Sequence, residues 1–219
     1  MRACSFRRLA AVVCAAAVCA GLAGCAAGGP ASRTDFFMST LVTQQAYGPR
    51  AEKALAQAAD TLREWETRLS LYEEDSDVCR INAAAGVQPV QVSEATAVLL
   101  AQAKALAQTT DGAFALTVAP ITLAWGVRSG SPRVVPPEEC AALAALVDDS
   151  ALQLTQNTAF LSKEGQGLDL GGCAKGAALD AVADVYEKEG VQSAVVSLGG
   201  NVYARGTKPG GLPRPIKGR

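Results

Sequence analysis

Several segments of the chain repeat apolar residues at the spacing of a helix face, i, i+3 and i+4. Pro49, Ser76 and Ser93 each precede such a segment, and these residue types suit the first turn or the N-cap of a helix. The segments predicted as helices are 49–69, 76–82, 94–108, 137–146 and 174–189. The apolar face predicted for 94–108 consists of Ala97, Val98, Leu100, Ala101, Ala105 and Leu106.

Other segments are short and rich in β-branched and aromatic residues, which indicates strands. The predicted strands are 35–43, 89–92, 152–154, 159–161, 194–198 and 202–205. Asn157 lies between two of them, as in a hairpin. Residues 110–120 are predicted to be extended, and 128–137 to form a surface loop. Strands and helices mix without regular βα alternation, so the predicted fold class is α+β, with mixed sheets and flanking helices.

The first residues have the pattern of an export signal. Residues 1–24 carry three arginines followed by an apolar run that is too short to span a bilayer. Residues 22–25, Leu-Ala-Gly-Cys, are typical of a lipobox, which makes Cys25 the predicted lipidated N-terminus and 25–34 a tether. The protein is then exported and lipid-anchored on the extracytoplasmic side of the cell membrane. The alternative is an ordinary secretory signal with a chance cysteine.

Composition excludes several classes of function. Without the three arginines of the signal, the chain has 17 basic and 21 acidic residues. The resulting formal charge of about −4 argues against a nucleic-acid partner. The chain has no histidine, which excludes a Ser-His-Asp triad and a histidine metal site within it. The cysteines that follow Cys25 are odd in number and form no C-x-x-C motif; they are Cys79, Cys140 and Cys173. Neither a disulfide framework nor a zinc site is therefore predicted.

One stretch, 168–180, suggests chemistry. Gly171 and Gly172 interrupt a short apolar run, and a predicted helix with Lys175 in its first turns follows at once. Free N–H groups at a helix N-terminus, together with a lysine, favour an anion such as phosphate. The order is neither that of a Walker A loop nor G-x-G-x-x-G. The alternative is a tight turn followed by a solvated lysine.

Several segments together resemble one family. The chain is similar to the ApbE-type FAD:protein FMN transferases, lipoproteins that move the FMN half of FAD onto a threonine or serine hydroxyl of an acceptor protein. The matching segments are Met38-Ser39-Thr40 (usually Met-Gly-Thr in the family), Leu69-Ser70-Leu71-Tyr72, Asp75-Ser76, Ile81-Asn82, Thr110-Asp111-Gly112-Ala113-Phe114 with Thr117 and Pro120, Trp125-Gly126, Asp169 to Gly176 with Asp180, and Leu198-Gly199-Gly200-Asn201.

The resemblance implies an ApbE-like (T-fold-like) architecture and gives roles to individual positions. Met38 and Tyr72 match residues at the flavin, and the segment of Gly112, Ala113 and Phe114 matches one that holds FAD. Asp169 and Lys175 match the segment beside the ribityl-pyrophosphate, and the carbonyl of Ala174 matches a Mg²⁺ ligand. The implied reaction is attack of an acceptor hydroxyl on the FMN phosphorus with release of AMP, assisted by Mg²⁺. The sequence does not identify the acceptor protein.

Two departures from the family pattern bear on activity. Ala115 stands where the family usually has aspartate. The family also continues into an acidic/threonine metal-binding motif and a histidine-containing segment, whereas this chain closes with a Pro/Arg/Lys-rich stretch. The predicted domain is therefore 35–211, C-terminally truncated, with 212–219 an aberrant tail. The alternative functions are a membrane-tethered FAD-binding lipoprotein without transfer activity, or an inactive fragment.

Overall fold

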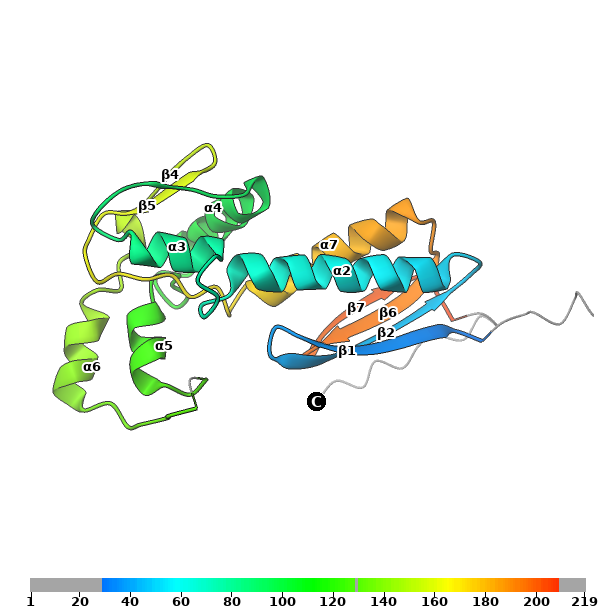
Figure 1. Cartoon of the computed structure of the whole chain (residues 1–219), viewed down its shortest axis with the longest axis horizontal. Coiled ribbons are helices and arrows are strands. Elements are labelled where there is room, and N and C mark those ends of the chain that lie inside the picture. The colour runs from blue at the N-terminus through cyan, green and yellow to red at the C-terminus, as the bar shows by residue number, and fades with distance from the viewer. Residues whose placement is uncertain (1–28, 129, 209–219) are drawn as a thin grey trace, which may run out of the picture.

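The computed structural model describes residues 29–128 and 130–208. The predicted signal peptide 1–24, the lipidation of Cys25 and the tail 212–219 lie outside the described residues. Among the described helices, none has the length and apolar character that crossing a membrane requires. The predicted α+β class is confirmed, since two antiparallel sheets are flanked by helices (Figure 1).

A four-stranded sheet and two helices form one half of the molecule. The strands, in spatial order, are β1 (Ala31–Phe37), β2 (Thr40–Tyr47), β6 (Ser193–Leu198) and β7 (Asn201–Arg205), all antiparallel to their neighbours. Helices α2 (Ala51–Leu69) and α7 (Ala174–Lys188) pack side by side on one face of this sheet (Figure 1). The first core lies between these layers, and within it Tyr186 donates a hydrogen bond of 2.8 Å to Gln44 Oε1.

The predicted strand 35–43 is a hairpin instead. Phe37 pairs with Thr40, and the two residues between them, Met38 and Ser39, have φ angles of 51° and 57°. A two-residue turn with both φ values positive matches the right-handed twist of its strands, but it normally uses Asn-Gly or Asp-Gly. The expected turn signal is therefore missing from the sequence. Strand β1 also begins at Ala31, inside the predicted tether 25–34.

The other half contains the remaining helices and a three-stranded sheet. Its elements are α3 (Asp77–Ala83), β3 (Val90–Gln91), α4 (Glu94–Thr109), α5 (Ala119–Trp125), α6 (Pro137–Ala144), the 3₁₀ turn η1 (Asp149–Ala151), β4 (Leu152–Thr155) and β5 (Thr158–Leu161). The sheet order is β3-β5-β4, and the predicted hairpin is its β4–β5 pair. A second core fills this half, and Met38 and Trp65 pack against both cores.

Local capping explains where two helices begin. The Ser76 hydroxyl accepts a hydrogen bond of 2.9 Å from Cys79 N, and the Ser93 hydroxyl accepts one of 3.2 Å from Thr96 N. Each bond satisfies an N–H group that has no partner within its own helix. The predicted N-caps of α3 and α4 are therefore confirmed.

Two predictions for this half are wrong. The buried face of α4 is Thr96, Ala97, Leu99, Leu100, Ala103 and Ala107. Val98 and Leu106 are about half exposed. Because α4 carries apolar residues on most of its sides, the sequence pattern does not indicate which side is buried. Residues 110–120 were predicted to be extended, yet α5 begins at Ala119 with Pro120 in its first turn, a position that tolerates proline.

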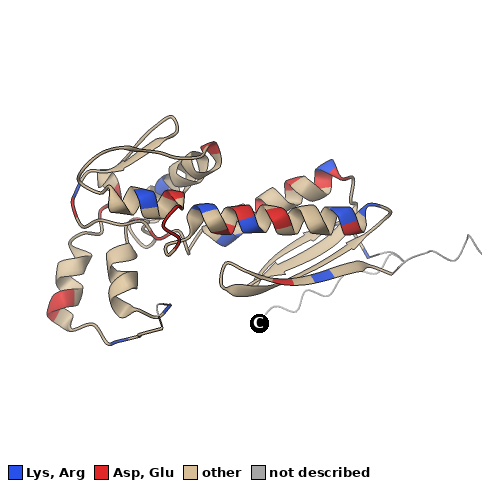
Figure 2. Cartoon of the chain, viewed as in Figure 1, with Lys and Arg blue, Asp and Glu red and all other residues tan. Residues whose placement is uncertain are grey.

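Charged residues of both signs interleave along the outer side of α2 (Figure 2). Arg63 pairs with Asp60 at 2.6 Å, and Arg68 pairs with Glu64 at 3.2 Å. Because these pairs are solvent-exposed, each contributes at most about 0.5 kcal/mol to folding. The outer side of α2 is therefore a solvated surface, whereas its C-terminal end reaches the junction between the two cores.

Candidate functional site

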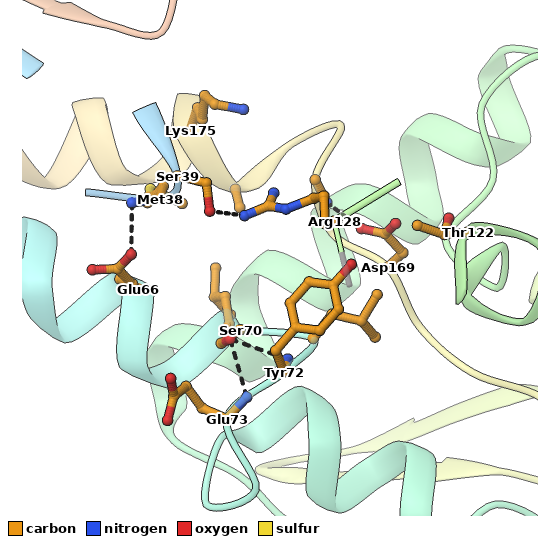
Figure 3. Close-up of a pocket in the computed structure, with 14 residues that line it drawn as sticks. Met38, Ser39, Glu66, Ser70, Tyr72, Glu73, Thr122, Arg128, Asp169 and Lys175 are labelled. Carbon is orange, nitrogen blue, oxygen red and sulfur yellow. Dashed lines mark hydrogen bonds between the residues drawn. The ribbon is translucent and has the colours of Figure 1, made fainter. Parts of the chain in front are cut away.

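A cavity of about 240 Å³ lies at the junction between the two cores (Figure 3). It is formed by the β1–β2 turn, the end of α2 with the loop that follows, α5 with the residues after it, and the start of α7. The lining residues are Met38, Ser39, Glu66, Leu69, Ser70, Leu71, Tyr72, Glu73, Thr122, Arg128, Asp169, Gly171, Ala174 and Lys175.

Five of the predicted site residues meet in this cavity, namely Met38, Tyr72, Asp169, Ala174 and Lys175. The predicted FAD-holding segment, Gly112, Ala113 and Phe114, is not among the lining residues. It lies next to the cavity, however, because a Cβ added at Gly172 would come within 2.9 Å of Phe114 Cε2. The ring of Phe114 therefore packs closely against the turn that begins α7.

The β1–β2 turn presents Met38 and Ser39 to the cavity in a conformation that is costly for residues with a Cβ. A left-handed backbone costs a non-glycine residue about 1–2 kcal/mol. Helix α2 helps to hold the turn, since Glu66 Oε1 accepts a hydrogen bond of 2.8 Å from Met38 N. Such strain concentrates where a ligand is bound or a residue must be aimed.

Tyr72 lies on a loop whose conformation is stabilised by hydrogen bonds of Ser70 and Ser76. The Ser70 hydroxyl accepts hydrogen bonds of 3.1 Å from the backbone N–H groups of Tyr72 and Glu73. The Ser76 hydroxyl in turn donates a bond of 2.6 Å to the Ser70 carbonyl. The Tyr72 side chain is 43% exposed, so an aromatic surface remains open at the cavity.

The segment that leads into α7 is held by a residue from α3. The Asn82 side chain accepts a hydrogen bond of 2.6 Å from Leu168 N and donates one of 3.0 Å to Leu168 O, much as a neighbouring strand would. Asp169 Oδ1 then accepts a bond of 2.8 Å from Gly171 N. These contacts position the Gly171–Gly172 turn at the cavity wall.

The first turn of α7 provides donors for an anion. Cys173 N and Ala174 N both donate to the Leu170 carbonyl, at 3.0 and 2.8 Å. Within the described part of the chain, the backbone N–H groups of Lys175 and Gly176 have no acceptor, and the Lys175 ammonium has no carboxylate within 4 Å. The helix N-terminus and the lysine therefore both favour negative charge here.

Cys173, beside this turn, has a thiol whose environment favours the protonated form. Burial, and then the nearby Asp169 carboxylate, raise the pKa of the Cys173 thiol to about 11. The protonated thiol donates a weak hydrogen bond of 3.5 Å to the Leu170 carbonyl. Covalent catalysis by this cysteine is therefore not supported.

Arg128 is a cavity residue that the sequence does not predict. It was assigned to a surface loop, but its guanidinium donates a hydrogen bond to the Ser39 hydroxyl and lies 5.6 Å from the centre of the Tyr72 ring (Figure 3). A cation at this distance over an aromatic face is attracted to it. The only sequence signal was the neighbouring Trp125-Gly126 match, which did not point to the arginine.

The family model described as "ApbE family" matches residues 38–217, most of the chain. The chain belongs to the ApbE family.

The relatives agree with this assignment. The chain is 34% identical over 157 residues to an FAD:protein FMN transferase of Klebsiella pneumoniae, which covers 71% of this chain and 50% of that protein. It is 31% identical over 225 residues to an FAD:protein FMN transferase of Treponema pallidum, and this match covers 94% of the chain and 60% of that protein. The chain thus spans about half to three-fifths of the length of these curated relatives.

Solved ApbE structures have the same fold. The flavin transferase ApbE from Vibrio cholerae superposes with a TM-score of 0.80 at 27% identity, covering 86% of this chain and 63% of that one. The apo form of the Pseudomonas stutzeri flavinyl transferase ApbE superposes with a TM-score of 0.78 at 29% sequence identity, and the match covers 86% of this chain and 62% of that one. The predicted ApbE-like architecture is therefore confirmed.

The predicted Mg²⁺ has few possible protein ligands in the described part of the chain. Among the described residues, no three acidic, cysteine or histidine side chains cluster as a metal site. The cavity includes Ala174, whose carbonyl was the predicted ligand, and the Asp169 carboxylate. Since Mg²⁺ is commonly held by one or two carboxylates together with substrate phosphates, this set fits such an arrangement but not a metal site made of protein alone.

Proposed function

We propose that this ApbE-family chain binds FAD in the cavity and transfers FMN to a threonine or serine hydroxyl of an acceptor protein, releasing AMP. One observation carries the proposal. Five positions that the family resemblance assigns to flavin, pyrophosphate or metal come from distant parts of the sequence and line a single cavity. The names of the curated relatives, FAD:protein FMN transferase, support the same reaction.

The chemistry of the cavity suits the two ends of FMN. Tyr72 and Met38 offer an aromatic ring and a polarisable thioether, which are good partners for a flat heteroaromatic system. Lys175 and the free N–H groups of α7 suit a pyrophosphate. A volume of about 240 Å³ is below the roughly 300–1,000 Å³ of typical ligand pockets, so the described walls enclose part of FAD.

In the proposed step, the acceptor oxygen bonds to the FMN phosphorus while the bond from that phosphorus to the AMP oxygen breaks. AMP leaves with the electron pair, and the proton of the acceptor hydroxyl is released to water. Lys175 would hold the charged phosphate oxygens in place for this displacement. Mg²⁺, held by the Ala174 carbonyl, Asp169 and phosphate oxygens, would supply further neutralisation of their charge.

The test uses the full chain in mild detergent. FAD binding is followed by flavin fluorescence, and transfer by AMP release together with covalent fluorescent labelling of cell-envelope proteins. We expect Lys175→Ala to weaken FAD binding about 10- to 100-fold, the loss that follows removal of a charged hydrogen-bond partner. Lys188→Ala, exposed at the other end of the same helix, is the matched control and should bind as the wild type does.

The outcomes separate the candidate functions. FAD binding with AMP release and a labelled acceptor supports the transferase. Tight FAD binding without label would instead support the FAD-binding lipoprotein, and aggregation without flavin binding would support the inactive fragment. Equal binding by the Lys175→Ala and Lys188→Ala variants would remove Lys175 from the proposed site.

We also propose that the protein is exported and anchored to the membrane through a lipid on Cys25. The lipobox pattern at residues 22–25 supports this location. Labelling of growing cells with a palmitate analogue should mark the wild type but not a Cys25→Ala variant, which should leave the membrane fraction. A labelled Cys25→Ala variant would contradict the proposal.

A further inference from the structure

Arg128 is held in the cavity from two sides. Its guanidinium donates to the Ser39 hydroxyl on the β1–β2 turn and lies over the Tyr72 ring on the loop after α2 (Figure 3). Ser39 is 89 residues away in the sequence, so this contact joins distant segments across the site. The guanidinium therefore has a defined place in the wall of the cavity.

The acceptor of that hydrogen bond sits on strained backbone. Ser39 has a φ of 57° in a turn where glycine would avoid the Cβ penalty. Arg128 holds one residue of the turn through the Ser39 hydroxyl, and Glu66 holds the other through Met38 N at 2.8 Å. The turn and the arginine thus fix each other's position.

The cavity is lined by two cations, Arg128 and Lys175, and by three carboxylates, those of Glu66, Glu73 and Asp169. In the described part of the chain, neither Arg128 nor Lys175 has a carboxylate within 4 Å. Two of the three carboxylates, those of Glu66 and Asp169, accept hydrogen bonds from backbone N–H groups. Two cations on different elements therefore remain for a ligand, and the guanidinium keeps donors that Ser39 does not use.

We propose that Arg128 is a second anion-binding residue of this cavity and contacts the pyrophosphate of the dinucleotide together with Lys175. The planar guanidinium offers paired N–H donors that match two phosphate oxygens, a geometry that an ammonium lacks. Ser39 is the positioning residue for this contact. The inference rests on the proposed binding of FAD and adds a residue from the segment after α5 to that site.

The experiment compares Arg128→Gln with Arg133→Gln in the full chain. Arg133 lies in the same loop but pairs with Glu139 outside the cavity, so it controls for the loss of one positive charge. The probes are FAD, riboflavin, which lacks phosphate, and inorganic pyrophosphate. Arg128→Gln should weaken FAD and pyrophosphate binding about 10- to 100-fold and leave riboflavin within about twofold. Arg133→Gln should change none of the three.

Three results would overturn the inference. Tighter binding of FAD and riboflavin by Arg128→Gln would mean that the arginine occupies the place of the flavin. Equal weakening of both would mean a structural role, and unchanged binding of FAD would mean no role. If Arg128→Gln does not fold, Arg128→Lys replaces it and should weaken FAD and pyrophosphate binding but not riboflavin binding.

The same data test the proposed function separately. Wild-type protein that transfers FMN, with Arg128→Gln equal to it, would refute only the role of Arg128. Wild-type protein that binds pyrophosphate through Arg128 but does not bind FAD would refute the proposed function and leave the anion site standing. Wild-type protein that binds neither would refute both.

Discussion

Asp77 joins the first turns of α3 and α4, and its replacement by asparagine is the sharpest stability test that the structure offers. Its carboxylate accepts hydrogen bonds from Ser93 N at 3.1 Å, Ser93 Oγ at 2.9 Å and Thr96 Oγ1 at 2.6 Å. Arg80 also pairs with it, but that guanidinium is 42% exposed and contributes little. Asp77 itself is 6% exposed, so the bonds from α4 are formed away from water.

Asp77→Asn keeps the shape of the side chain, removes its charge and turns an NH₂ group toward donors. A hydrogen bond to a charged group contributes about 1.5–3 kcal/mol, and an unsatisfied buried donor costs about 1–3 kcal/mol. Because these terms overlap, we expect a loss of about 2–4 kcal/mol in the free energy of unfolding. At about 2–4 °C per kcal/mol for a chain of this size, the melting temperature should fall by about 5–15 °C.

The pH dependence gives a second readout. Burial alone would raise the pKa of Asp77, but the hydrogen bonds from Thr96 and Ser93, together with Arg80, outweigh it and hold the pKa below the ordinary 3.8. A lowered pKa means that the carboxylate stabilises the fold fully above pH 3.8, and that this stabilisation is lost as the pH falls through the folded-state pKa. The stability gap between wild type and Asp77→Asn should therefore narrow in acid.

The assay is urea unfolding followed by circular dichroism at pH 7 and at several pH values below 4. Asp75→Asn, an exposed carboxylate two residues away, is the matched control and should change stability by less than about 0.5 kcal/mol. A loss below 1 kcal/mol for Asp77→Asn at pH 7, or a gap that widens as the pH falls, would refute this account of how α3 and α4 are held together.

Three further predictions test other parts of the molecule. Gly172→Ala forces its Cβ against the Phe114 ring, 2.9 Å away, and should cost about 1–3 kcal/mol by thermal unfolding; an unchanged melting temperature would show that the ring moves freely. Burial and a neighbouring carboxylate raise the pKa of Cys173 to about 11. Iodoacetamide should therefore label Cys173 far more slowly at pH 7.5 than it labels a free cysteine peptide, as measured by mass spectrometry, and equal labelling rates would contradict this. Tyr186→Phe removes the hydrogen-bond donor of the buried Gln44 side chain, whose Nε2 already has no partner among the described residues. Urea unfolding should therefore show a loss of about 1–3 kcal/mol in the free energy of unfolding, and a loss below about 0.5 kcal/mol would mean that the bond contributes little.

Elements with a strong local signal could be predicted from the sequence. Ser76 and Ser93 cap the helices that follow them, because the cap and the N–H group it satisfies are only three residues apart. The Gly171–Gly172 turn into α7 was found for the same reason. The β4–β5 hairpin also follows from its own short segment.

Elements without such a signal were predicted wrongly. The reversal at Met38 and Ser39 lacks glycine or asparagine, and its shape is held by Glu66, 28 residues away from Met38. The buried side of α4 depends on contacts such as the bond from Thr96 to Asp77, 19 residues away. In both cases the partner that decides the conformation lies outside any local window.

The candidate site divides in the same way. The family resemblance, which rests on short motifs, singled out Met38, Tyr72, Asp169 and Lys175, and their roles toward FAD remain predictions. That these residues line one cavity follows only from the packing of two cores against the β1–β2 turn. Arg128 was not predicted at all.

The sequence by itself therefore determined the fold class, most of the helices and a glycine turn with a lysine suited to an anion, because these follow from spacing along the chain. The residues expected at the flavin came only from the family resemblance. The tertiary structure decided the strained turn at Met38 and Ser39, the exposed sides of α4 and the placement of Arg128 over Tyr72. The physical reason is that burial, backbone strain and charge balance depend on which distant side chains meet, and the contact between Arg128 and Ser39 spans 89 residues.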